Sequence, residues 1–201
     1  MASITTGRAG ENGLRAPLLD SMYRLRSDVF RRRLGWDVRV EDGREHDWFD
    51  LIGPHYVVVH DNASRALGCC RLLPTLGPNM LRDIFPELLD GAPAPASASI
   101  WEVSRFALCE EHSQGGFGFS AISSSLIAET FRFIAAQGAD TLVGVTSAPF
   151  ERMMRHMGLQ VERLGKPRRI GKTISLAFRM PVAENLAVAG PAPAVHVAHA
   201  A

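Results

Sequence analysis

The stretch YRLRSDVFRRRLGWDVRVEDGREHDWFD, residues 23–50, joins a basic helical segment to an acidic loop. Apolar residues recur at three- and four-residue spacing before and within it, which predicts an amphipathic helix; they are Leu18, Met22, Leu25 and Val29. Gly35 lies where this helix should end, because glycine enters the left-handed conformation without a Cβ clash. Segment 37–50 then holds six acidic residues against two arginines. Such a charged, aromatic-bearing segment is costly as a purely structural element, so we expect it to form part of a site.

The composition predicts a single core. The chain has 201 residues, 46% of them hydrophobic, and a formal net charge of +1, which argues against a nucleic-acid or membrane partner. Segment 151–172 is the exception, with seven basic residues against two acidic ones. This local excess indicates an acidic partner or an anionic substrate, and a solvated face is the equally open alternative.

Neither cysteine chemistry nor a targeting segment is indicated. Cys69, Cys70 and Cys109 form no CxxC or metal-ligand spacing, and no apolar run is long enough to span a membrane. We therefore expect a soluble, reduced, cytoplasmic protein without a metal or permanently bound cofactor. We also expect a flexible segment at 1–14, a single domain at 15–180 and a disordered tail at 181–201, because the tail is rich in Ala, Pro and Val.

The middle of the chain predicts strands. Segments 55–60 and 66–73 are β-branched or apolar and are separated by turn residues, which indicates a hairpin. The second of these strands contains Arg71, which needs an acidic partner if it is buried, and the acidic loop is the expected source; an edge-strand position in water is the alternative. Segment 100–108 predicts a further strand, with Glu102 and Ser104 on one face and Arg105 on the other.

The later elements complete an α/β pattern. We predict short helical structure at 80–89 broken by Pro86 and a helix from about 119 to 136. A strand at 140–147 and a helix ending near Gly158 should follow, then closing strands at 159–164 and 173–180. Residues 112–120 are glycine-rich; they match an acetyltransferase pyrophosphate loop only in part and fit an ordinary turn equally well.

Several short motifs occur along the chain in a fixed order. Arg26 precedes Phe30 by four residues, and the remaining pieces are Leu34-Gly35-Trp36, Asp47-Trp48-Phe49-Asp50, Arg71 within CCRLLPT, and Glu102-Val103-Ser104-Arg105-Phe106. This ordered set resembles the acyl-homoserine-lactone synthases, the bacterial autoinducer synthases, over roughly residues 18–180. The resemblance implies a three-layer α/β/α sandwich of the acetyltransferase-like type. Its mixed sheet would open into a V-shaped cleft between the central strands at 100–108 and 140–147.

The resemblance also implies a reaction. The α-amine of S-adenosylmethionine would attack an acyl thioester on acyl carrier protein. The methionine carboxylate would then close the lactone and expel methylthioadenosine. Glu102 would be the candidate base, since a buried glutamate in a strand is expensive unless it is paired or working. A salt bridge with Arg71 or a solvent-facing position are the structural alternatives.

The other roles follow from the same resemblance. We assign catalysis to Glu102, Ser104 and Asp47. Asp47 and Asp50 would bind the amine or hold Arg71 and Arg105, and Arg26 would meet the substrate carboxylate or join that network. Phe30 and Trp36 would face the adenosyl-sulfonium, with core packing as the alternative. The predicted substrate-binding set is Arg26, Phe30, Trp36, Asp50, Arg71, Phe85, Arg105, Phe106 and Gly144.

The donor sites complete the hypothesis. Arg152, Arg155, Lys166 and Arg168 would contact the acidic carrier protein, and Leu126, Ile127, Met153 and Met157 would line an acyl pocket. Gly144 stands where the family often has a threonine in enzymes with 3-oxo-acyl preference, which favours a chain without a 3-oxo group. A coenzyme-A-dependent N-acetyltransferase on the same fold and a catalytically silent binding protein are the competing hypotheses.

Overall fold

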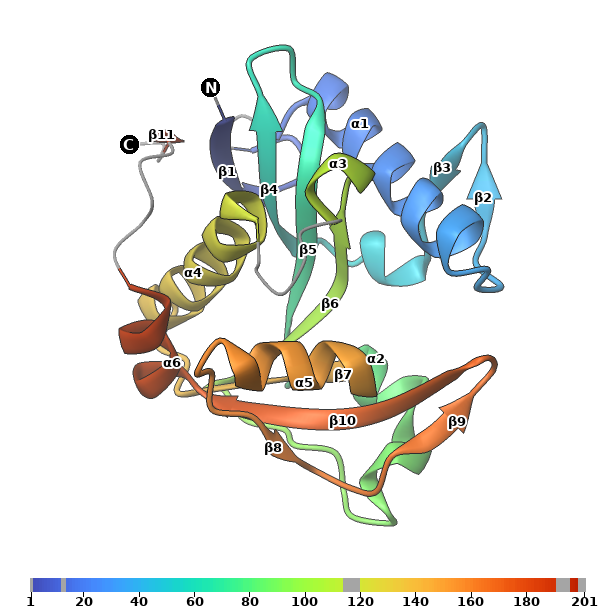
Figure 1. Cartoon of the computed structure of the whole chain (residues 1–201), viewed down its shortest axis with the longest axis vertical. Coiled ribbons are helices and arrows are strands. Elements are labelled where there is room, and N and C mark those ends of the chain that lie inside the picture. Colours follow the sequence, from blue (N-terminus) through green and yellow to red (C-terminus); the bar gives the residue numbers. More distant parts are fainter. Residues whose placement is uncertain (1, 12–13, 114–119, 191–195, 199–201) are drawn as a thin grey trace. The chain divides into compact units, whose positions relative to one another are not determined.

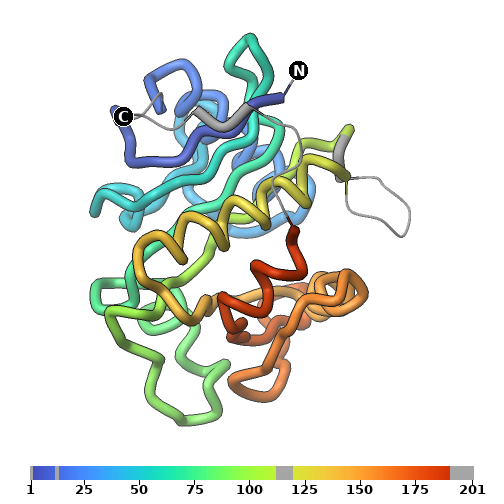
Figure 2. The backbone as a smooth tube through the Cα atoms, turned by 90° about the vertical axis from the view of Figure 1, so that its left-hand side faces the viewer, coloured from blue at the N-terminus to red at the C-terminus, as the bar shows by residue number. Residues whose placement is uncertain are grey.

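The computed structural model describes residues 2–11, 14–113, 120–190 and 196–198. The chain forms two compact units, which are described separately. The first comprises residues 1–71, 105–130 and 191–201, and the second comprises residues 72–104 and 131–190. Figure 2 traces the chain by colour as it passes between these ranges. We predicted a single domain over 15–180, and this stays a prediction.

The strands of the first unit follow the order β11-β1-β4-β5-β6 (Figure 1). Their bounds are β1 Ala2–Arg8, β4 His55–Asp61, β5 Ala66–Pro74, β6 Ile100–Leu108 and β11 His196–Ala198. The predicted hairpin is confirmed as β4 and β5. β1 pairs with β4 antiparallel and with β11 in parallel, so the flexible segment expected at 1–14 was wrong over residues 2–8. The sequence of β1 gives little sign of a strand, because Ile4 is its only large apolar side chain. Its pairing with β4, which is distant in sequence, defines this element.

The predicted N-terminal helix is confirmed with one change of geometry. It begins as α1 (Ala16–Arg26) and continues as a π-helical segment, η1 (Ser27–Arg33). The four expected apolar positions are all buried. Gly35 has a φ of 64°, and the N–H of Trp36 donates to the carbonyl of Phe30 at 2.8 Å. The helix therefore ends at the predicted glycine, with Trp36 directly after the turn.

Short elements carry the acidic loop and the rest of this unit. They are β2 Val40–Glu41, β3 Arg44–Glu45, the 3-10 helix η2 Trp48–Asp50 and the helix α3 Glu110–Ser113. The helix α4 (Ala121–Ala136) follows and runs on into the second unit. Most of the glycine-rich segment, residues 114–119, lies outside the described residues, and so does the loop pattern expected there. The cysteines Cys69, Cys70 and Cys109 are free and buried.

The second unit holds a mixed sheet in the order β6-β7-β10-β8, with β9 also paired to β10. Its further strands are β7 Thr141–Ser147, β8 Glu162–Arg163, β9 Arg168–Ile170 and β10 Thr173–Pro181. β6 and β7 are parallel, with Ile100–Val103 in register with Thr141–Gly144, and the pairs made by β10 are antiparallel. The predicted strand at 159–164 was too long, since only two of its residues pair.

The second unit also contains helices, and they are α2 Met80–Asp83, the 3-10 helix η3 Pro86–Leu89, α5 Ala148–His156 and α6 Val182–Ala189. The helical structure is interrupted before Pro86, which begins η3, and Ser147 caps α5 by accepting from the N–H of Phe150 at 3.3 Å. The disordered tail predicted for 181–201 was wrong over α6, because Asn185 is buried and its side chain binds the main chain of Gln160. The small apolar residues of 182–189 form a helix because the side chain of Asn185 anchors this segment.

The predicted α/β class with a mixed central sheet and flanking helices is confirmed. The parallel ladder between β6 and β7 ends at the pair Val103–Gly144, and the V-shaped cleft expected beyond this point stays a prediction. Among the described residues, no helix has both the length and the apolar character that crossing a membrane requires.

Candidate active site

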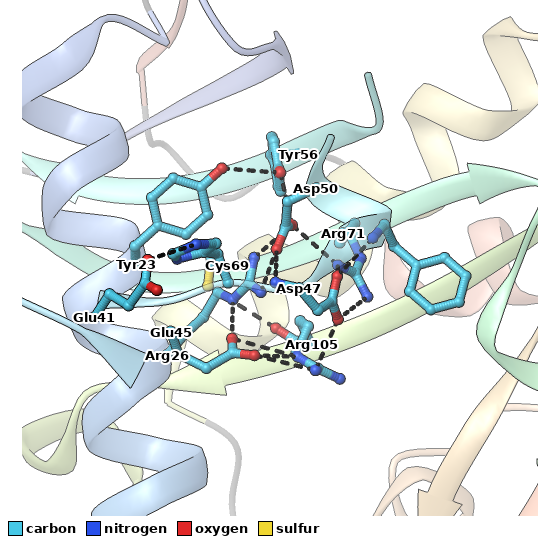
Figure 3. Close-up of polar contacts among 12 residues, drawn as sticks. Tyr23, Arg26, Glu41, Glu45, Asp47, Asp50, Tyr56, Cys69, Arg71 and Arg105 are labelled. Carbon is cyan, nitrogen blue, oxygen red and sulfur yellow. Dashed lines mark hydrogen bonds and ion pairs between the residues drawn. The ribbon is translucent and has the colours of Figure 1, made fainter. Parts of the chain in front are cut away.

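Six charged side chains of the first unit form a closed ring of ion pairs (Figure 3). Going around it, Glu45 contacts Arg26 at 2.6 Å, Arg26 contacts Asp50 at 2.8 Å, and Asp50 contacts Arg71 at 3.0 Å. Arg71 then contacts Asp47 at 2.5 Å, Asp47 contacts Arg105 at 2.8 Å, and Arg105 returns to Glu45 at 3.1 Å. We call these residues the ion-pair ring; they are Arg26, Glu45, Asp47, Asp50, Arg71 and Arg105.

The spacing of the two aspartates follows from local capping. Asp47 precedes η2 and accepts from the N–H of Phe49 at 2.9 Å, while Asp50 accepts from the N–H of Asp47 at 2.8 Å. This reciprocal arrangement is a capping box, which requires two polar side chains three residues apart. The motif therefore helps to fix both carboxylates through main-chain contacts, in addition to their contacts with the arginines.

Each arginine of the ring also has an aromatic neighbour. The guanidinium carbon of Arg26 lies 5.2 Å from the ring centre of Tyr23, that of Arg71 lies 5.3 Å from Phe49, and that of Arg105 lies 5.4 Å from Phe30. Guanidinium groups placed over aromatic faces gain cation–π attraction, most of all where water is excluded. The three buried cations are thus held by both carboxylates and aromatic faces.

The ring is electrically balanced and almost closed to water. Three arginines match three carboxylates, and the side chain of Asp47 is 20% exposed while that of Arg105 is 9% exposed and the other four are at most 3% exposed. Of the two roles expected for Asp47 and Asp50, the structure shows the contacts with arginines: both bind Arg71, and Asp47 also binds Arg105. Asp47 is the most accessible member of the ring.

Asp50 is the most strongly held carboxylate. Burial opposes its ionisation, but hydrogen bonds and charge attraction from Arg26, together with the charge of Arg71, keep its pKa well below the usual range. The hydroxyl of Tyr56 donates to Asp50 at 2.8 Å, and the hydroxyl of Tyr23 lies 3.2 Å from that of Tyr56. Burial and the charge of Asp50 raise the pKa of Tyr56 well above its ordinary value, so Tyr56 acts as a hydrogen-bond donor.

Arg105 reaches the ring through an unusual backbone. Its φ is 53°, a left-handed conformation that costs a residue with a Cβ on the order of 1–2 kcal/mol. The strict alternation predicted along 100–108 therefore fails at this residue. Strain of this kind persists only where surrounding contacts fix the conformation, and the carboxylates of Glu45 and Asp47 supply those contacts.

The predicted aromatic pair lies beside the ring. Phe30 is buried and stacks on Trp36, with centroids 5.1 Å apart and planes 20° apart. Trp36 itself is 39% exposed. Core packing therefore describes Phe30, whereas Trp36 is partly exposed to the solvent.

Glu102 belongs to the second unit and is 1% exposed, which rules out the solvent-facing alternative. Its two carboxylate oxygens accept from the N–H of Met80 at 2.9 Å and from that of Leu81 at 2.6 Å. These N–H groups begin α2, where helical donors lack partners within the helix. The candidate base is thus held rigidly by the first turn of a helix.

The remaining predicted residues have mixed surroundings. Ser104 and Phe106 are half-buried on β6, and Phe85 packs against the apolar core of the second unit, made by Leu81, Leu88, Leu89, Val143 and Ala177. Gly144 leaves no space for a side chain, because a Cβ there would lie 2.7 Å from the carbonyl oxygen of Val103 and 2.9 Å from the phenyl group of Phe178. Of the expected acyl-pocket residues, Leu126 and Ile127 are buried and Met153 is exposed.

The predicted carrier-protein residues are exposed, and neighbouring acids neutralise part of their charge. Glu151 pairs with Arg155 at 3.2 Å and with Arg163 at 2.6 Å. Asp90 pairs with Arg168 at 2.8 Å and also accepts from the main-chain N–H of Lys166 at 2.7 Å. Because Asp90 lies outside segment 151–172, the net positive charge of this surface is smaller than the count of charged residues in that segment indicates.

Comparison with known proteins identifies the family. The family model described as autoinducer synthase matches residues 12–189. The chain belongs to the autoinducer synthase family. A curated acyl-homoserine-lactone synthase of Pseudomonas aeruginosa is 41% identical to this synthase over 165 residues, which cover 81% of the chain and 82% of that relative. The predicted enzyme class, an acyl-homoserine-lactone synthase, is confirmed.

Solved structures agree on the fold of the synthase. The crystal structure of the AHL synthase LasI matches with a TM-score of 0.83 and 36% identity, covering 94% of each chain. A CoA-dependent acyl-homoserine lactone synthase, BjaI, solved with SAM and isopentyl-CoA, matches with a TM-score of 0.85 and 26% identity, covering 98% of this chain and 93% of that one. The predicted acetyltransferase-like fold is confirmed.

Sequence reasoning missed two members of the site. Glu45 was counted among the acidic residues but received no role, although it is fully buried in the ion-pair ring. Tyr56, which supports Asp50, was treated as part of a strand only. The local signal for Glu45 was its place two residues before Asp47, a spacing that puts both side chains on one face of an extended segment.

Proposed function

We propose that this synthase makes an N-acyl-homoserine lactone from S-adenosylmethionine and an acyl thioester carried by acyl carrier protein. The observation that carries this proposal is the balanced ion-pair ring with one accessible carboxylate, Asp47. Asp47 is joined through Arg105 and Phe30 to the exposed face of Trp36. Such an arrangement suits an amino acid that bears two positive groups, an ammonium and a sulfonium.

The binding roles follow from accessibility. The exposed edge of Asp47 accepts the ammonium or amine, and the face of Trp36 meets the adenosyl-sulfonium, where a desolvated cation can gain about 2 kcal/mol. Arg26 is buried between Glu45 and Asp50, so it supports the site from within and leaves the substrate carboxylate to other groups. Phe30 is also buried, and it supports Trp36 by stacking on it.

The first chemical step is acyl transfer. The amine nitrogen attacks the thioester carbon, an N–C bond forms, the C–S bond breaks, and the amine proton passes by way of a base to the carrier thiolate. An α-amine with a pKa near 8 is roughly one-tenth neutral at pH 7, so deprotonation costs only about 1 kcal/mol. Holding both reactants in line supplies more, on the order of 7–11 kcal/mol.

Glu102 is the proposed base for this step. The two N–H groups of α2 fix its carboxylate, which favours orienting the amine or a bridging water over strong basicity. Positioned proton transfer of this kind is typically worth about 10²–10⁴-fold in rate. Ser104, two residues along β6, is the proposed contact of the acyl carbonyl.

The second step is lactonisation. A carboxylate oxygen of the methionine portion attacks Cγ, and the electron pair of the Cγ–S bond moves to the sulfonium, which leaves as neutral methylthioadenosine. The leaving group is already activated, so the enzyme needs only to fold the chain so that the carboxylate faces Cγ.

Acyl carrier protein is the proposed donor because exposed basic residues lie on α5 and on the β8–β9 connection. BjaI uses a CoA donor, so acyl-CoA is the alternative. Charge reversal at Arg152 and Lys166 separates the two donors, because it should weaken binding of a protein partner that contacts several such residues. The affinity of such a partner should also fall with added salt. We expect the double variant Arg152→Glu/Lys166→Glu to raise KM for acyl carrier protein at least tenfold and to leave KM for S-adenosylmethionine unchanged.

The decisive experiment measures methylthioadenosine release by the purified protein. Acyl carrier proteins and acyl-CoAs of several chain lengths, with and without a 3-oxo group, serve as donors. We expect methylthioadenosine release only when S-adenosylmethionine and an acyl donor are both present. We also expect preference for a donor without the 3-oxo group, because Gly144 stands where 3-oxo-preferring relatives often have a threonine and leaves no room for such a polar side chain. S-adenosylhomocysteine is the matched control, since it keeps the amine and carboxylate but lacks the sulfonium leaving group.

Two results would contradict the proposal. Transfer from acyl-CoA to unrelated amines, without methylthioadenosine, would support an N-acetyltransferase on this fold. Binding of S-adenosylmethionine without turnover of any donor would support a silent binding protein.

A further inference from the structure

Asn79 is a buried polar residue outside the ion-pair ring. It directly precedes α2 and is 1% exposed. Its Oδ1 atom accepts from the N–H of Arg82 at 3.0 Å, and its Nδ2 atom donates to the carbonyl oxygens of Thr75 at 3.3 Å and Gly77 at 3.1 Å. An amide without partners would be costly to bury, and here each of these contacts is with the main chain. The side chain therefore links the first turn of α2 to the segment that precedes it.

Thr75 links the same segment to β6. It is fully buried, and both its N–H and its hydroxyl donate to the carbonyl oxygen of Ile100, at 3.1 Å and 2.9 Å. The hydroxyl also accepts from the N–H of Ser97 at 3.2 Å. Ile100 begins β6 and lies two residues before Glu102. The segment that Asn79 contacts is thus bonded to the strand that carries the proposed base.

Together these contacts form a closed circuit through Glu102. Its carboxylate accepts from the first two N–H groups of α2. Asn79 joins that helical turn to the preceding segment, and Thr75 joins this segment to β6. A capping side chain fixes the first turn of a helix, because it bonds one of the N–H groups that have no partner within the helix. The direction of the N–H groups that hold Glu102 therefore depends on Asn79.

We infer that Asn79 is a positioning residue for Glu102. By capping α2 it keeps two N–H groups directed at the carboxylate, which then stays at one place relative to β6. Asn79 acts through Glu102 and contacts no substrate in this role. A misplacement of about 1 Å can cost on the order of 10²-fold in rate. This inference rests on the proposed function, in which Glu102 is the base for acylation.

The test compares Asn79→Ala with Asn62→Ala, a matched control because Asn62 is exposed in the turn between β4 and β5. The measurements are the single-turnover rate of acylation, KM for S-adenosylmethionine and for the acyl donor that gives the wild type its highest rate, and Tm. We expect Asn79→Ala to lower Tm, to lower the acylation rate at least tenfold and to change either KM less than threefold. The reason is that the base is displaced while the groups that bind the substrates stay in place. Asn62→Ala should match the wild type.

Two further variants distinguish positioning from general stability. Asn79→Ser keeps an oxygen that can cap α2, so its acylation rate should stay within threefold of the wild type. The double variant Asn79→Ala/Glu102→Gln should acylate within threefold of the rate of Glu102→Gln alone, because groups that act as a unit do not lose the same activity twice. A residue that served stability alone would lower the rate by the same factor in both backgrounds.

The outcomes separate this inference from the proposed function. A wild-type rate in Asn79→Ala, no recovery in Asn79→Ser, or an equal further loss in the double variant would overturn the positioning role while Glu102 kept its assignment. If Asn79→Ala does not fold, Thr75→Val takes its place in both backgrounds, because it opens the same circuit between Asn79 and β6. We expect it to lower the rate with both KM values unchanged, and a wild-type rate would overturn the inference. Undiminished acylation by Glu102→Gln, or a wild type that releases no methylthioadenosine, would overturn the proposed function itself and this inference with it.

Discussion

Asp47 shows how one residue can serve both fold and site. It caps η2 through the N–H of Phe49, pairs with Arg71 and Arg105, and keeps a fifth of its side chain exposed. Ion pairs that are largely buried contribute little net stability, but removing one partner is costly because a charge is left unpaired. We therefore expect a substitution at Asp47 to affect both the ring and the proposed substrate site.

Asp47→Asn tests the substrate role at this residue. Asparagine can still cap η2 through its side-chain oxygen, while the site loses the negative charge that attracts the amine. We expect KM for S-adenosylmethionine to rise at least tenfold, measured by methylthioadenosine release at saturating acyl donor. Asp42→Asn is the control, because Asp42 is exposed and its left-handed φ of 49° also suits asparagine. Equal KM values in the two variants would argue against the assignment.

Glu102→Gln tests the proposed base. The amide retains one acceptor oxygen but turns its NH2 group toward one of the two N–H donors of α2, and an unsatisfied buried donor costs about 1–3 kcal/mol. We expect a lower Tm with the fold kept, and a fall in kcat of about 10²–10⁴-fold, measured in single-turnover acylation. Glu87→Gln on the exposed surface of η3 should change neither. Acylation at the wild-type rate would exclude Glu102 as the base.

At the scale of elements, the connection between β8 and β9 is pinned to the end of η3. Asp90 accepts from the N–H of Lys166 and pairs with Arg168, and these two hydrogen bonds keep the pKa of Asp90 below its usual value. Gly165 lies so close to η3 that a Cβ would be 2.2 Å from the carbonyl oxygen of Leu88. This contact holds two of the four predicted carrier-protein residues in place.

Gly165→Ala should therefore displace that connection. Overpacking against a backbone atom typically costs about 1–3 kcal/mol, and the shift would move Lys166 and Arg168 away from their positions at Asp90. We expect a higher KM for acyl carrier protein with KM for S-adenosylmethionine unchanged. Gly77→Ala is the control, since a Cβ there meets its nearest atom at an ordinary 3.8 Å. Unaltered donor kinetics in Gly165→Ala would remove the carrier-protein role from this connection.

The π-helical segment η1 is a second element that positions the site. It follows α1 directly, so Arg26 at its start is buried toward the ion-pair ring and Phe30 is buried beneath Trp36. π-helical turns are rare and occur often at functional sites. The hydrogen bond from Leu34 N–H to the carbonyl of Val29 at 3.0 Å shows the five-residue spacing of this geometry.

At the scale of the whole molecule, the ring links stability to pH. The pKa of Asp50 is lower in the folded protein than in the unfolded chain, so its ionisation stabilises the fold. This stabilisation is fully present above the ordinary carboxyl pKa of about 4 and is lost as the pH falls toward the lower, folded-state pKa. The free energy of unfolding should therefore fall steeply in acid.

Tyr56→Phe tests this linkage. It removes the hydrogen bond to the Asp50 carboxylate, and a hydrogen bond to a charged group contributes about 1.5–3 kcal/mol. We expect the variant to lose stability of that order at pH 7, measured by urea unfolding, and the difference from wild type to narrow only as the pH falls through the folded-state pKa of Asp50, well below the ordinary carboxyl value of about 4. Tyr23→Phe leaves the contact with Asp50 intact and should give a smaller, pH-independent difference. A pH-independent loss in Tyr56→Phe would contradict the role assigned to Asp50.

The sequence by itself determined the elements whose signals are local. Apolar spacing predicted the first helix, Gly35 predicted its end, and turn residues predicted the β4–β5 hairpin. The ordered motifs indicated the family, and the cost of burying a charge in a strand predicted that Arg71 needs acidic partners. In each case the stabilising contact lies within a few residues or is forced by the cost of burying a charge.

Only the tertiary structure decided the features that depend on distant partners. Glu45 becomes part of the site through Arg26 and Arg105, which lie 19 and 60 residues away in sequence. β1 forms through pairing with β4, and α6 is anchored by the contacts of Asn185 with Gln160. The left-handed backbone of Arg105 is likewise invisible to alternation rules, because the contacts that offset its cost come from another part of the chain. Long-range pairing leaves no local pattern, and so it had to be observed.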